Sequence, residues 1–291
     1  MRLLARRLRV PVARFDTATG RWAYVGASVD AAGDADRDEL TLTTYNIWFD
    51  SKYAEPRYRA IAELLSRRAP DIMVFQEVTP TALDVLLGAP WIRTDYASAS
   101  VVGDHVGNYG LLMLSRLPVT RVTYTRLPSR LDRGYLTAEF SVSGARQVVC
   151  CIHLDSGKSW WPLRAWQLRR IFGALRRTTD AVVLGDFNMR DDENERIPAS
   201  YRDVWTTLRP DEDGFTEDTA INHMRYDMKN KSRQVRFDRV LLKGPRWTAD
   251  EIELLGTEPI ADELPRIFPS DHFGVWCRLR RRNPSEARHR R

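Results

Sequence analysis

The sequence predicts an α/β protein whose sheets are covered by helices. Short apolar segments rich in β-branched residues recur along the chain, as strands do, and a few longer segments have the spacing of amphipathic helices. The two kinds of segment do not alternate regularly, which argues against a helical bundle and against repeated strand–helix units. With 43% hydrophobic residues among 291, the chain can bury the core of one large domain or of two ordinary ones.

Residues 1–39 are expected to form a peripheral N-terminal segment and a linker. A small hairpin is predicted around Thr19-Gly20, and the Asp-rich stretch from Ala31 to Glu39 is typical of a linker. The first fifteen residues carry five Arg and no acid. They lack the apolar centre of a secretion signal and the Ser residues of an organelle transit peptide.

Residues 40–280 are expected to form the main domain. Its first helix has three apolar residues on one face and ends before Pro70, and a later helix opens at Pro162 with apolar residues at i, i+3, i+4 and i+7 from Leu168. A polar, loop-rich stretch is expected over 190–234. The first of the two helices spans 58–68, and a further short helix is expected over 81–87. The expected strands are 40–47, 71–77, 110–114, 136–142, 146–154, 182–186, 235–242 and 273–279.

The positive charge of the chain is concentrated at its C-terminal end. The formal net charge is +6, and residues 278–291 hold seven Arg against one Glu, so the body is nearly neutral. The basic tail, residues 281–291, is open to two interpretations: a solvated arm, or an arm that binds phosphates without sequence preference.

Cysteine content and hydropathy favour a reducing compartment and no membrane association. The three Cys, two of them adjacent at Cys150 and Cys151, form neither a disulfide framework nor a metal-binding spacing. No apolar run approaches the roughly 20 residues that a membrane span needs. We therefore expect a cytoplasmic protein, and we expect it to be a monomer.

The segment Val182-Val183-Leu184-Gly185-Asp186-Phe187-Asn188 is the strongest candidate for a site. A buried strand ends in Gly, and Asp186 and Asn188 then point to the same side because they are two residues apart. A carboxylate can hold a metal or orient a water, and a carboxamide can donate to a phosphoryl oxygen. Taken alone, the same residues are more often part of a turn.

Other strand ends carry similar chemistry: Asn46, Glu77, His153, Asp271 and His272, with Asp238 inside a further strand. Each has a simpler interpretation, as an exposed strand end, a core His, a turn cap or, for Asp238, a surface ion pair. Together, the carboxylates offer the oxygen ligands that Mg²⁺ or Mn²⁺ prefers, whereas Zn²⁺ would want more His or Cys. The Lys of a P-loop is missing after Gly185.

Five ordered motifs resemble those of the endonuclease/exonuclease/phosphatase superfamily. The resemblance spans residues 40–280 and implies a four-layer α/β/β/α sandwich, with two packed mixed sheets between helices and the site at one end. The motifs are Thr44-Tyr45-Asn46-Ile47, Phe75-Gln76-Glu77-Val78, His153-Leu154-Asp155-Ser156, Gly185-Asp186-Phe187-Asn188 and Ser270-Asp271-His272-Phe273-Gly274.

Within the superfamily, the motifs are most similar to those of type-2 tyrosyl-DNA phosphodiesterases. Arg236-Phe237-Asp238-Arg239-Val240 resembles their Arg-Phe-Asp-Arg-Ile. Two positions depart from the pattern: Phe187 replaces a frequent Thr, and Glu217 replaces a Trp that can stack on a base. Loss of such a platform would remove about 1–3 kcal/mol of affinity for a single strand.

The resemblance implies a Mg²⁺-dependent phosphodiesterase (Mn²⁺ can substitute) that acts on nucleic-acid ends, with removal of 5′-tyrosyl adducts from DNA during repair as its specific form. The alternatives are hydrolysis of a small or lipid phosphate, another nuclease activity on abasic DNA or RNA, and an inactive scaffold that binds nucleic acid through its tail. The motif residues argue against the scaffold.

Each motif residue takes an expected role from this resemblance. Glu77 and Asp271 would hold the metal ion, and Asp186 would orient or deprotonate the attacking water. Asn46, Asn188, His153 and His272 would donate to the phosphoryl oxygens, with Asp238 orienting His272. Substrate binding is expected from Trp160, Trp161, Glu217 and Asp218. Trp160 and Trp161 would either wall the cleft or pack as core.

Overall fold

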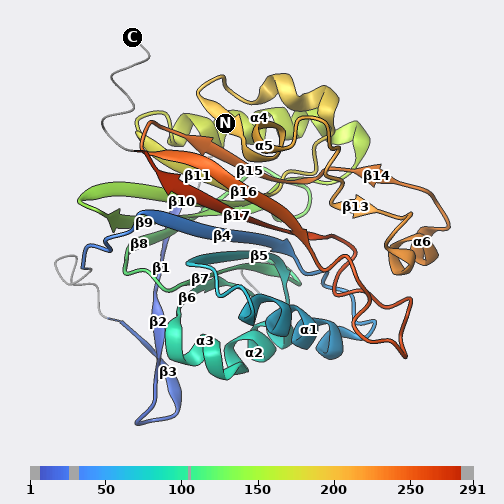
Figure 1. Cartoon of the computed structure of the whole chain (residues 1–291), viewed down its shortest axis with the longest axis horizontal. Coiled ribbons are helices and arrows are strands. Elements are labelled where there is room, and N and C mark those ends of the chain that lie inside the picture. The colour runs from blue at the N-terminus through green and yellow to red at the C-terminus, as the bar shows by residue number, and fades with distance from the viewer. Residues whose placement is uncertain (1–6, 26–32, 104–105, 283–291) are drawn as a thin grey trace.

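The structure, a computed structural model, describes residues 7–25, 33–103 and 106–282. Two sheets pack face to face, and helices cover both outer faces (Figure 1). This is the four-layer arrangement expected from the sequence, and that prediction is confirmed. No helix among the described residues is long and apolar enough to cross a membrane.

The first sheet contains seven strands in the described part of the chain. All of its neighbours are antiparallel except β10 and β11, which run parallel. The order is β1 (Arg7–Val10), β8 (Val119–Arg126), β9 (Gly134–Val142), β10 (Ala145–His153), β11 (Asp180–Asp186), β15 (Asp238–Lys243) and β12 (Tyr201–Asp203).

The second sheet contains eight described strands, with one parallel pair, β4 and β5. Its order is β16 (Trp247–Leu255), β17 (Gly274–Arg281), β4 (Glu39–Asn46), β5 (Ile72–Val78), β7 (Gly110–Ser115), β6 (Ala97–Val101), β2 (Ala13–Asp16) and β3 (Arg21–Tyr24). A separate two-stranded ribbon pairs β13 (Glu217–Asp218) with β14 (Gln234–Val235).

The helices divide between the two outer faces (Figure 1). The second sheet is covered by α1 (Ala54–Ser66), α2 (Pro80–Gly88) and α3 (Pro90–Asp95), and the first sheet by α4 (Trp161–Ala174). Helix α5 (Val204–Leu208) packs Val204 and Trp205 into the core between the sheets. The elements α6 (His223–Lys229), η2 (Lys158–Trp160) and η3 (Asp191–Arg196) lie in connections. One apolar core lies between the two sheets. A second lies between the second sheet and its helices, and a third lies between the first sheet and α4.

Helix α1 begins at Ala54, earlier than the sequence predicted, because Pro56 stands in its first turn, where no intrahelical N–H is needed. The expected strand 235–242 is interrupted: β14 ends at Val235 and β15 starts at Asp238. Residues 190–234, expected to be loops, also contain short helices and strands. These short elements lack the length on which periodicity depends.

The described part of residues 1–39 is built into the sandwich. The predicted hairpin at Thr19-Gly20 is present as β2 and β3, and it extends the second sheet along β6. Strand β1 extends the first sheet along β8. The sequence expectation of a peripheral segment missed these pairings, because edge strands are recognised only once the neighbouring strand is placed. The expected basic tail lies outside the described residues from 283 onward.

The topology brings the polar strand ends to one end of the sandwich. Strands β10 and β11 run parallel and end together, with His153 opposite Asp186. Strand β15 runs the other way, so it starts there, with Asp238 opposite Asp186. In the second sheet, β4 ends at Asn46 and its antiparallel neighbour β17 starts just after His272.

Arg57 fixes the loops that follow β4. Its side chain is fully buried, and its five N–H groups donate one hydrogen bond each to main-chain carbonyl oxygens. Four of these belong to the segment 47–52 and one to Pro269, next to the Ser270-Asp271-His272 motif. This one guanidinium therefore joins two site-forming segments that are more than 200 residues apart in the sequence.

Candidate active site

The polar residues predicted from the sequence converge where the two sheets meet at that end. Asn46 and Glu77 come from the second sheet, and His153, Asp186 and Asp238 come from the first. The link between sheets is direct: Asn46 Nδ2 donates to Asp186 Oδ2 at 3.1 Å.

Asp186 is held as an ionised acceptor. Its Oδ2 accepts from the amides of Asn46 and Asn188, and its Oδ1 accepts from the Asn188 main-chain N–H at 2.8 Å. Burial alone would raise the pKa of Asp186, but the hydrogen bond with His153 and the charge of His272 hold it below its usual value. Gly185 makes this geometry possible, because a Cβ there would lie 2.0 Å from the carbonyl oxygen of Ile152.

Both amide hydrogens of the Asn188 side chain form hydrogen bonds within the protein. Its amide group donates one hydrogen to Asp186 Oδ2 at 2.9 Å and the other to the carbonyl of Leu154 at 3.2 Å. The expectation that Asn188 donates to a phosphoryl oxygen is therefore wrong in this conformation, because an amide has two donor hydrogens. Asn46 uses one hydrogen on Asp186 and keeps the other.

His153 is a neutral ring between Arg133 and Asp186. Burial and the charge of Arg133 lower the pKa of His153 to about 4. Nη1 of Arg133 lies 3.0 Å from Nδ1, so that nitrogen accepts and Nε2 carries the hydrogen. Nε2 lies 3.4 Å from Asp186 Oδ2. The ring therefore adds to the set of donors around Asp186.

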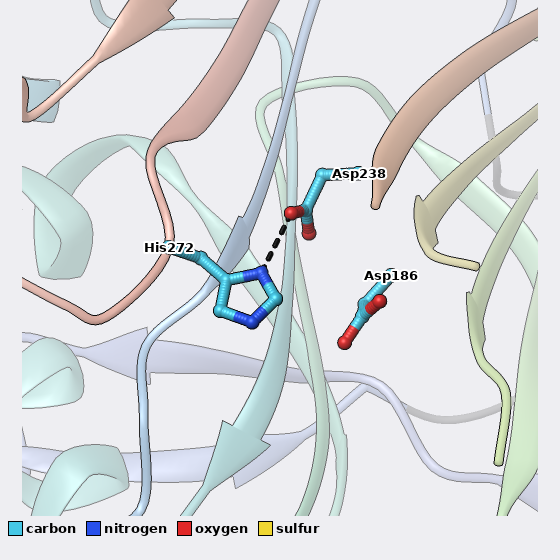
Figure 2. A group of neighbouring side chains, drawn as sticks. All are labelled: Asp186, Asp238 and His272. Atoms are coloured by element: carbon cyan, nitrogen blue, oxygen red, sulfur yellow. Dashed lines mark hydrogen bonds and ion pairs between the residues drawn. The ribbon is translucent and has the colours of Figure 1, made fainter. Parts of the chain in front are cut away.

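His272 and Asp238 form a buried pair, and the imidazole lies beside Asp186 (Figure 2). Nδ1 of His272 donates to Asp238 Oδ2 at 2.7 Å. Burial alone would lower the pKa of His272, but the charges of Asp238 and Asp271 raise it well above its usual value. The ring is thus a cationic donor held in a fixed orientation.

Glu77 and Asp271 are two largely buried carboxylates whose negative charge a divalent cation would offset. Burial and the charge of Asp271 raise the pKa of Glu77 to about 7, and burial raises the pKa of Asp271 as well. A hard cation would stabilise the ionised form of both carboxylates and so lower both pKa values. The donor set therefore fits Mg²⁺ or Mn²⁺. Ligand atoms of Asp186, Asp238 and His272 also lie within 4.8 Å of one another. That cluster is the poorer site, because the charged His272 has no free lone pair.

Glu217 does not face a substrate strand, which corrects the prediction made for it. Its side chain is only 2% exposed. Its Oε1 lies 2.8 Å from Nε of Arg225, and its Oε2 lies 3.2 Å from Nη1 of Arg233. The position that would carry a stacking Trp is thus taken by a buried ion pair, and Arg225 extends this pair to Asp271 at 3.7 Å.

Asp218 is likewise buried by its own loop. Its Oδ1 accepts from the main-chain N–H of Ala220, and Gln234 donates to both of its oxygens. The expected contact of Asp218 with substrate is therefore wrong, because these partners occupy the carboxylate. Phe187, the other departure from the motif pattern, is fully buried against the helices of the first sheet.

Trp160 and Trp161 are surface residues and not core residues. They are 38% and 46% exposed. The guanidinium of Arg130 lies 4.3 Å from the ring centroid of Trp160, and that of Arg196 lies 5.0 Å from the ring of Trp161. Their expected role in substrate binding stays a prediction.

Three residues at the site were not identified from the sequence. Arg133 contacts His153 and donates to the hydroxyl of Tyr109 at 2.9 Å, and Phe49 stacks on Tyr109 with ring centroids 4.6 Å apart. They lie in loops between elements, where no periodicity marks them. The only signal was their position next to strand ends, with Tyr109 before Gly110 and Arg133 before Gly134.

The family model described as the endonuclease/exonuclease/phosphatase family matches residues 43–272. The chain belongs to this family. The match includes every candidate site residue from Asn46 to His272, and it includes strands of both sheets. Membership in this family makes the chain an α/β-sandwich hydrolase of the phosphodiesterase type, and the resemblance inferred from the motifs is confirmed.

Curated relatives in this family include tyrosyl-DNA phosphodiesterase 2 of Danio rerio, which is 27% identical over 85% of this chain and 68% of its own length. The human protein of the same name is also 27% identical, over 82% and 68%. A 5′-tyrosyl-DNA phosphodiesterase of Caenorhabditis elegans is 26% identical, over 89% and 72%.

Solved structures agree on the fold. A structure of the Danio rerio enzyme complexed with single-strand DNA product has a TM-score of 0.74 at 24% identity and covers 84% of this chain and 99% of its own. The human Nocturnin catalytic domain with bound sulfate has a TM-score of 0.63 at 17% identity, over 84% and 96%. At these identities the likeness concerns the architecture alone.

Proposed function

We propose that this protein is a Mg²⁺-dependent phosphodiesterase that releases a tyrosyl group from the 5′ end of DNA and so serves DNA repair. The observation that carries this proposal is the convergence of an ionised Asp186 and a cationic His272 beside the carboxylates Glu77 and Asp271. Such a site offers an orienting acceptor for water, a donor for negative charge and hard ligands for a cation, the three requirements of phosphodiester hydrolysis.

Glu77 and Asp271 would hold Mg²⁺, and Mn²⁺ can substitute for it because both ions prefer oxygen ligands. The bound ion would neutralise part of the charge on the phosphate. Phe49 donates its main-chain N–H to Glu77 Oε2 at 3.2 Å and so leaves the other oxygen of that carboxylate for the ion.

Asp186 would orient the attacking water. The hydrogen bond with His153, the charge of His272 and the main-chain N–H of Asn188 lower its pKa, so it stays ionised but is a weak base, and its main contribution is geometric. Asn46 and Asn188 act as positioning residues for this carboxylate. The remaining amide hydrogen of Asn46 is available to a phosphoryl oxygen.

His272 would donate through Nε2 to a phosphoryl oxygen as negative charge develops there. Its Nδ1–H is committed to Asp238, so the free nitrogen has one defined direction. A preorganised cationic donor of this kind is worth about 2.7–4 kcal/mol at the transition state. His153 lies beside Asp186, with Nε2 3.4 Å from Oδ2, and stays neutral.

The choice of substrate is supported by the names of the relatives, which are tyrosyl-DNA phosphodiesterases, and by the neighbour whose structure contains a single-strand DNA product. DNA ends are therefore the partner that we propose. The monomeric state and the cytoplasmic location expected from the sequence stay predictions.

A substrate panel tests the proposed function. The protein, with Mg²⁺, is given a 5′-tyrosyl oligonucleotide, an abasic duplex, an RNA strand, an inositol phosphate and sphingomyelin, and kcat/KM is compared. We expect the 5′-tyrosyl oligonucleotide to be hydrolysed best and chelator to abolish the reaction. A higher kcat/KM on any other member of the panel would overturn the tyrosyl assignment.

A further inference from the structure

Helix α4 covers only part of the outer face of the first sheet. The apolar core beneath α4 includes residues of β10, β11 and β15 and, among the described residues, none of β1 or β8. Strand pairing places Arg7 opposite Thr125 and Arg9 opposite Thr123. Residues paired in this way point to the same face of a sheet. The outer face of β1 and β8 therefore carries Arg side chains where β10 and β11 carry an apolar core.

A cavity of about 330 Å³ lies where this outer face meets α4. Three guanidinium groups line it, those of Arg126 at the end of β8 and of Arg169 and Arg170 on α4. The hydroxyl-bearing residues Thr125 and Tyr135 line it as well, and none of its described lining residues is an acid. The composition of the lining is that of an anion site.

Cations outnumber acids on this surface, which we call the basic face. Two carboxylates lie on it: Glu139 pairs with Arg121 and Arg146, and Asp132 pairs with Arg126. Among the described residues, Arg7, Arg9 and Arg169 form no ion pair. The cations that define the basic face are Arg7, Arg9, Arg121, Arg126, Arg169 and Arg170.

This excess of positive charge is local. The chain without its C-terminal tail is nearly neutral, so cations gathered on one face are balanced by acids elsewhere. A surface with such a charge attracts a polyanion and lets its own counterions and those of the polyanion escape. The basic face is thus complementary to a chain of phosphates.

The basic face suits a duplex better than a single strand. Single-strand binding relies on exposed rings on which the bases stack. The cavity offers no such ring, because its one described aromatic residue, Tyr135, is only 5% exposed. A duplex is bound through its phosphates alone, and Arg is well suited to that contact. Strand β8 has eight residues, so the face is about 27 Å long, the length of about eight base pairs.

We propose that the basic face binds the phosphate backbone of duplex DNA, outside the hydrolytic site, with Arg7, Arg9 and Arg169 as its main contacts. The choice of DNA among polyanions rests on the proposed function. The face begins next to the site, since Arg126 pairs with Asp132 and the adjacent Arg133 contacts His153. A duplex held there keeps its end close to the hydrolytic groups.

The first test measures binding to a blunt duplex of about 20 base pairs without a tyrosyl group, by fluorescence anisotropy at several salt concentrations. In Arg7→Ala/Arg169→Ala, the slope of log K against log salt concentration should weaken by about 1.8, because each phosphate contact contributes about 0.9. Arg7→Lys/Arg169→Lys keeps both charges and should keep the slope. An unchanged slope in the Ala variant, or no binding of the duplex by the wild type at low salt, would overturn the proposal.

A matched control lies over the other sheet. Arg59→Ala/Arg67→Ala removes the same charge from the exposed side of α1. Its slope should stay as in the wild type, because only charges in contact with phosphates release counterions. Equal weakening in both Ala variants would show that net charge, and not the basic face, decides the affinity.

Anionic lipid is the other phosphate-bearing surface that such a face could meet. Vesicles of equal parts phosphatidylcholine and phosphatidylserine, in excess, are added to the complex of the wild-type protein with the labelled duplex. We expect the anisotropy to stay high, because the duplex carries the denser row of charges. Displacement of the duplex by the vesicles would overturn the assignment to DNA.

The binding measurement also separates this inference from the proposed function. The duplex carries no tyrosyl group, so its affinity is followed without turnover. If no tyrosyl substrate is hydrolysed, the proposed function fails, while the salt slope of Arg7→Ala/Arg169→Ala still decides the basic face. Hydrolysis of a one-nucleotide tyrosyl substrate should be as fast in this variant as in the wild type, because neither residue lies at the site. A slower reaction there would contradict a role confined to the duplex.

Discussion

Glu77 combines two features that cost a folded protein stability. Its carboxylate is buried near Asp271, and its main chain has a φ of 61°, in the left-handed region that non-glycine residues avoid. Residues held in this way cluster at functional sites, where the surrounding structure enforces them. The strain at Glu77 is therefore consistent with selection for its position and not for stability.

Glu77→Gln should stabilise the metal-free protein and make it unresponsive to Mg²⁺. A carboxyl whose pKa is raised to about 7 contributes stability that is lost as pH rises through that value. In chelator at pH 8, the melting temperature of Glu77→Gln should therefore exceed that of the wild type by about 3–5 °C, and at pH 5 the difference should shrink. Mg²⁺ should raise the melting temperature of the wild type only.

The matched control for Glu77→Gln is Glu63→Gln, on the exposed face of α1, which should change neither the melting temperature nor its response to Mg²⁺. Turnover of Glu77→Gln should fall by at least about 100-fold, since even outer-shell changes cost about 10–100-fold. Full Mg²⁺-dependent turnover in a folded Glu77→Gln protein would show that the metal is held elsewhere.

Asp238→Asn should move the alkaline limb of the pH–rate profile to lower pH. The charge of Asp238 is the largest of the three carboxylate charges that raise the pKa of His272, and the cationic ring is the active form. Removing that charge lets the ring lose its proton at a lower pH, so kcat falls earlier as pH rises. The profile of kcat between pH 6 and 10 measures this, and His272→Ala should lack the limb altogether. An unshifted limb would assign it to another group.

At the scale of elements, the loop after β4 and the start of β17 depend on Arg57 of α1. Arg57→Lys keeps the charge but has three donors in place of five, so at least two carbonyls lose their partner. We expect the free energy of unfolding to fall by about 2–4 kcal/mol in urea titrations. Arg59→Lys, on the exposed side of the same helix, should change it by less than about 0.5 kcal/mol. Equal effects would mean that the five bonds contribute little.

Glu217→Trp restores the aromatic residue that related enzymes carry there, yet it should impair this protein. The substitution leaves Arg225 and Arg233 without their shared partner, and Arg225 is nearly buried. We expect a loss of about 3–5 kcal/mol in the free energy of unfolding and no gain in kcat/KM on single-stranded substrates. Glu212→Trp, at an exposed ion pair, is the control and should be nearly neutral.

The catalytic segments could be predicted from the sequence because each combines a buried strand with a polar residue at its end. Strand direction then brings Asn46, His153 and Asp186 together, whatever the details of packing. No comparable rule applies to Glu217 or Arg133. Their directions depend on loops that pack against distant segments, and a local pattern contains no information on such contacts.

At the scale of the whole molecule, the N-terminal strands close an edge of each sheet. Val10 of β1 belongs to the core between the sheets, and β2 pairs with β6. A chain that starts at residue 33 should lose at least about 2 kcal/mol of stability from the apolar area it no longer buries. It should also aggregate in light scattering, because β8 and β6 become open edges. An unchanged denaturation midpoint and no scattering would show that these strands are dispensable.

The four-layer architecture followed from motifs that mark the strands of both sheets, so the fold was predictable once the family resemblance was seen. The order of the strands at the edges of the sheets could not be predicted from the sequence. Strands β1 and β2 are short, and their pairing partners, β8 and β6, lie more than 80 residues further along the chain. Short amphipathic segments of this kind fit several neighbours equally well, and only the assembled sheet selects one.

The contact between Asn46 and Asp186 joins two sheets that share no main-chain hydrogen bonds among the described residues. The site is therefore complete only when both sheets have folded and packed together. Each sheet alone would display only half of the hydrolytic groups, with Asn46 and Glu77 on one and His153, Asp186 and Asp238 on the other. A nascent or partly unfolded molecule would therefore be unable to cut a phosphodiester. Hydrolysis therefore requires that the two sheets are docked, so that the groups of both lie together.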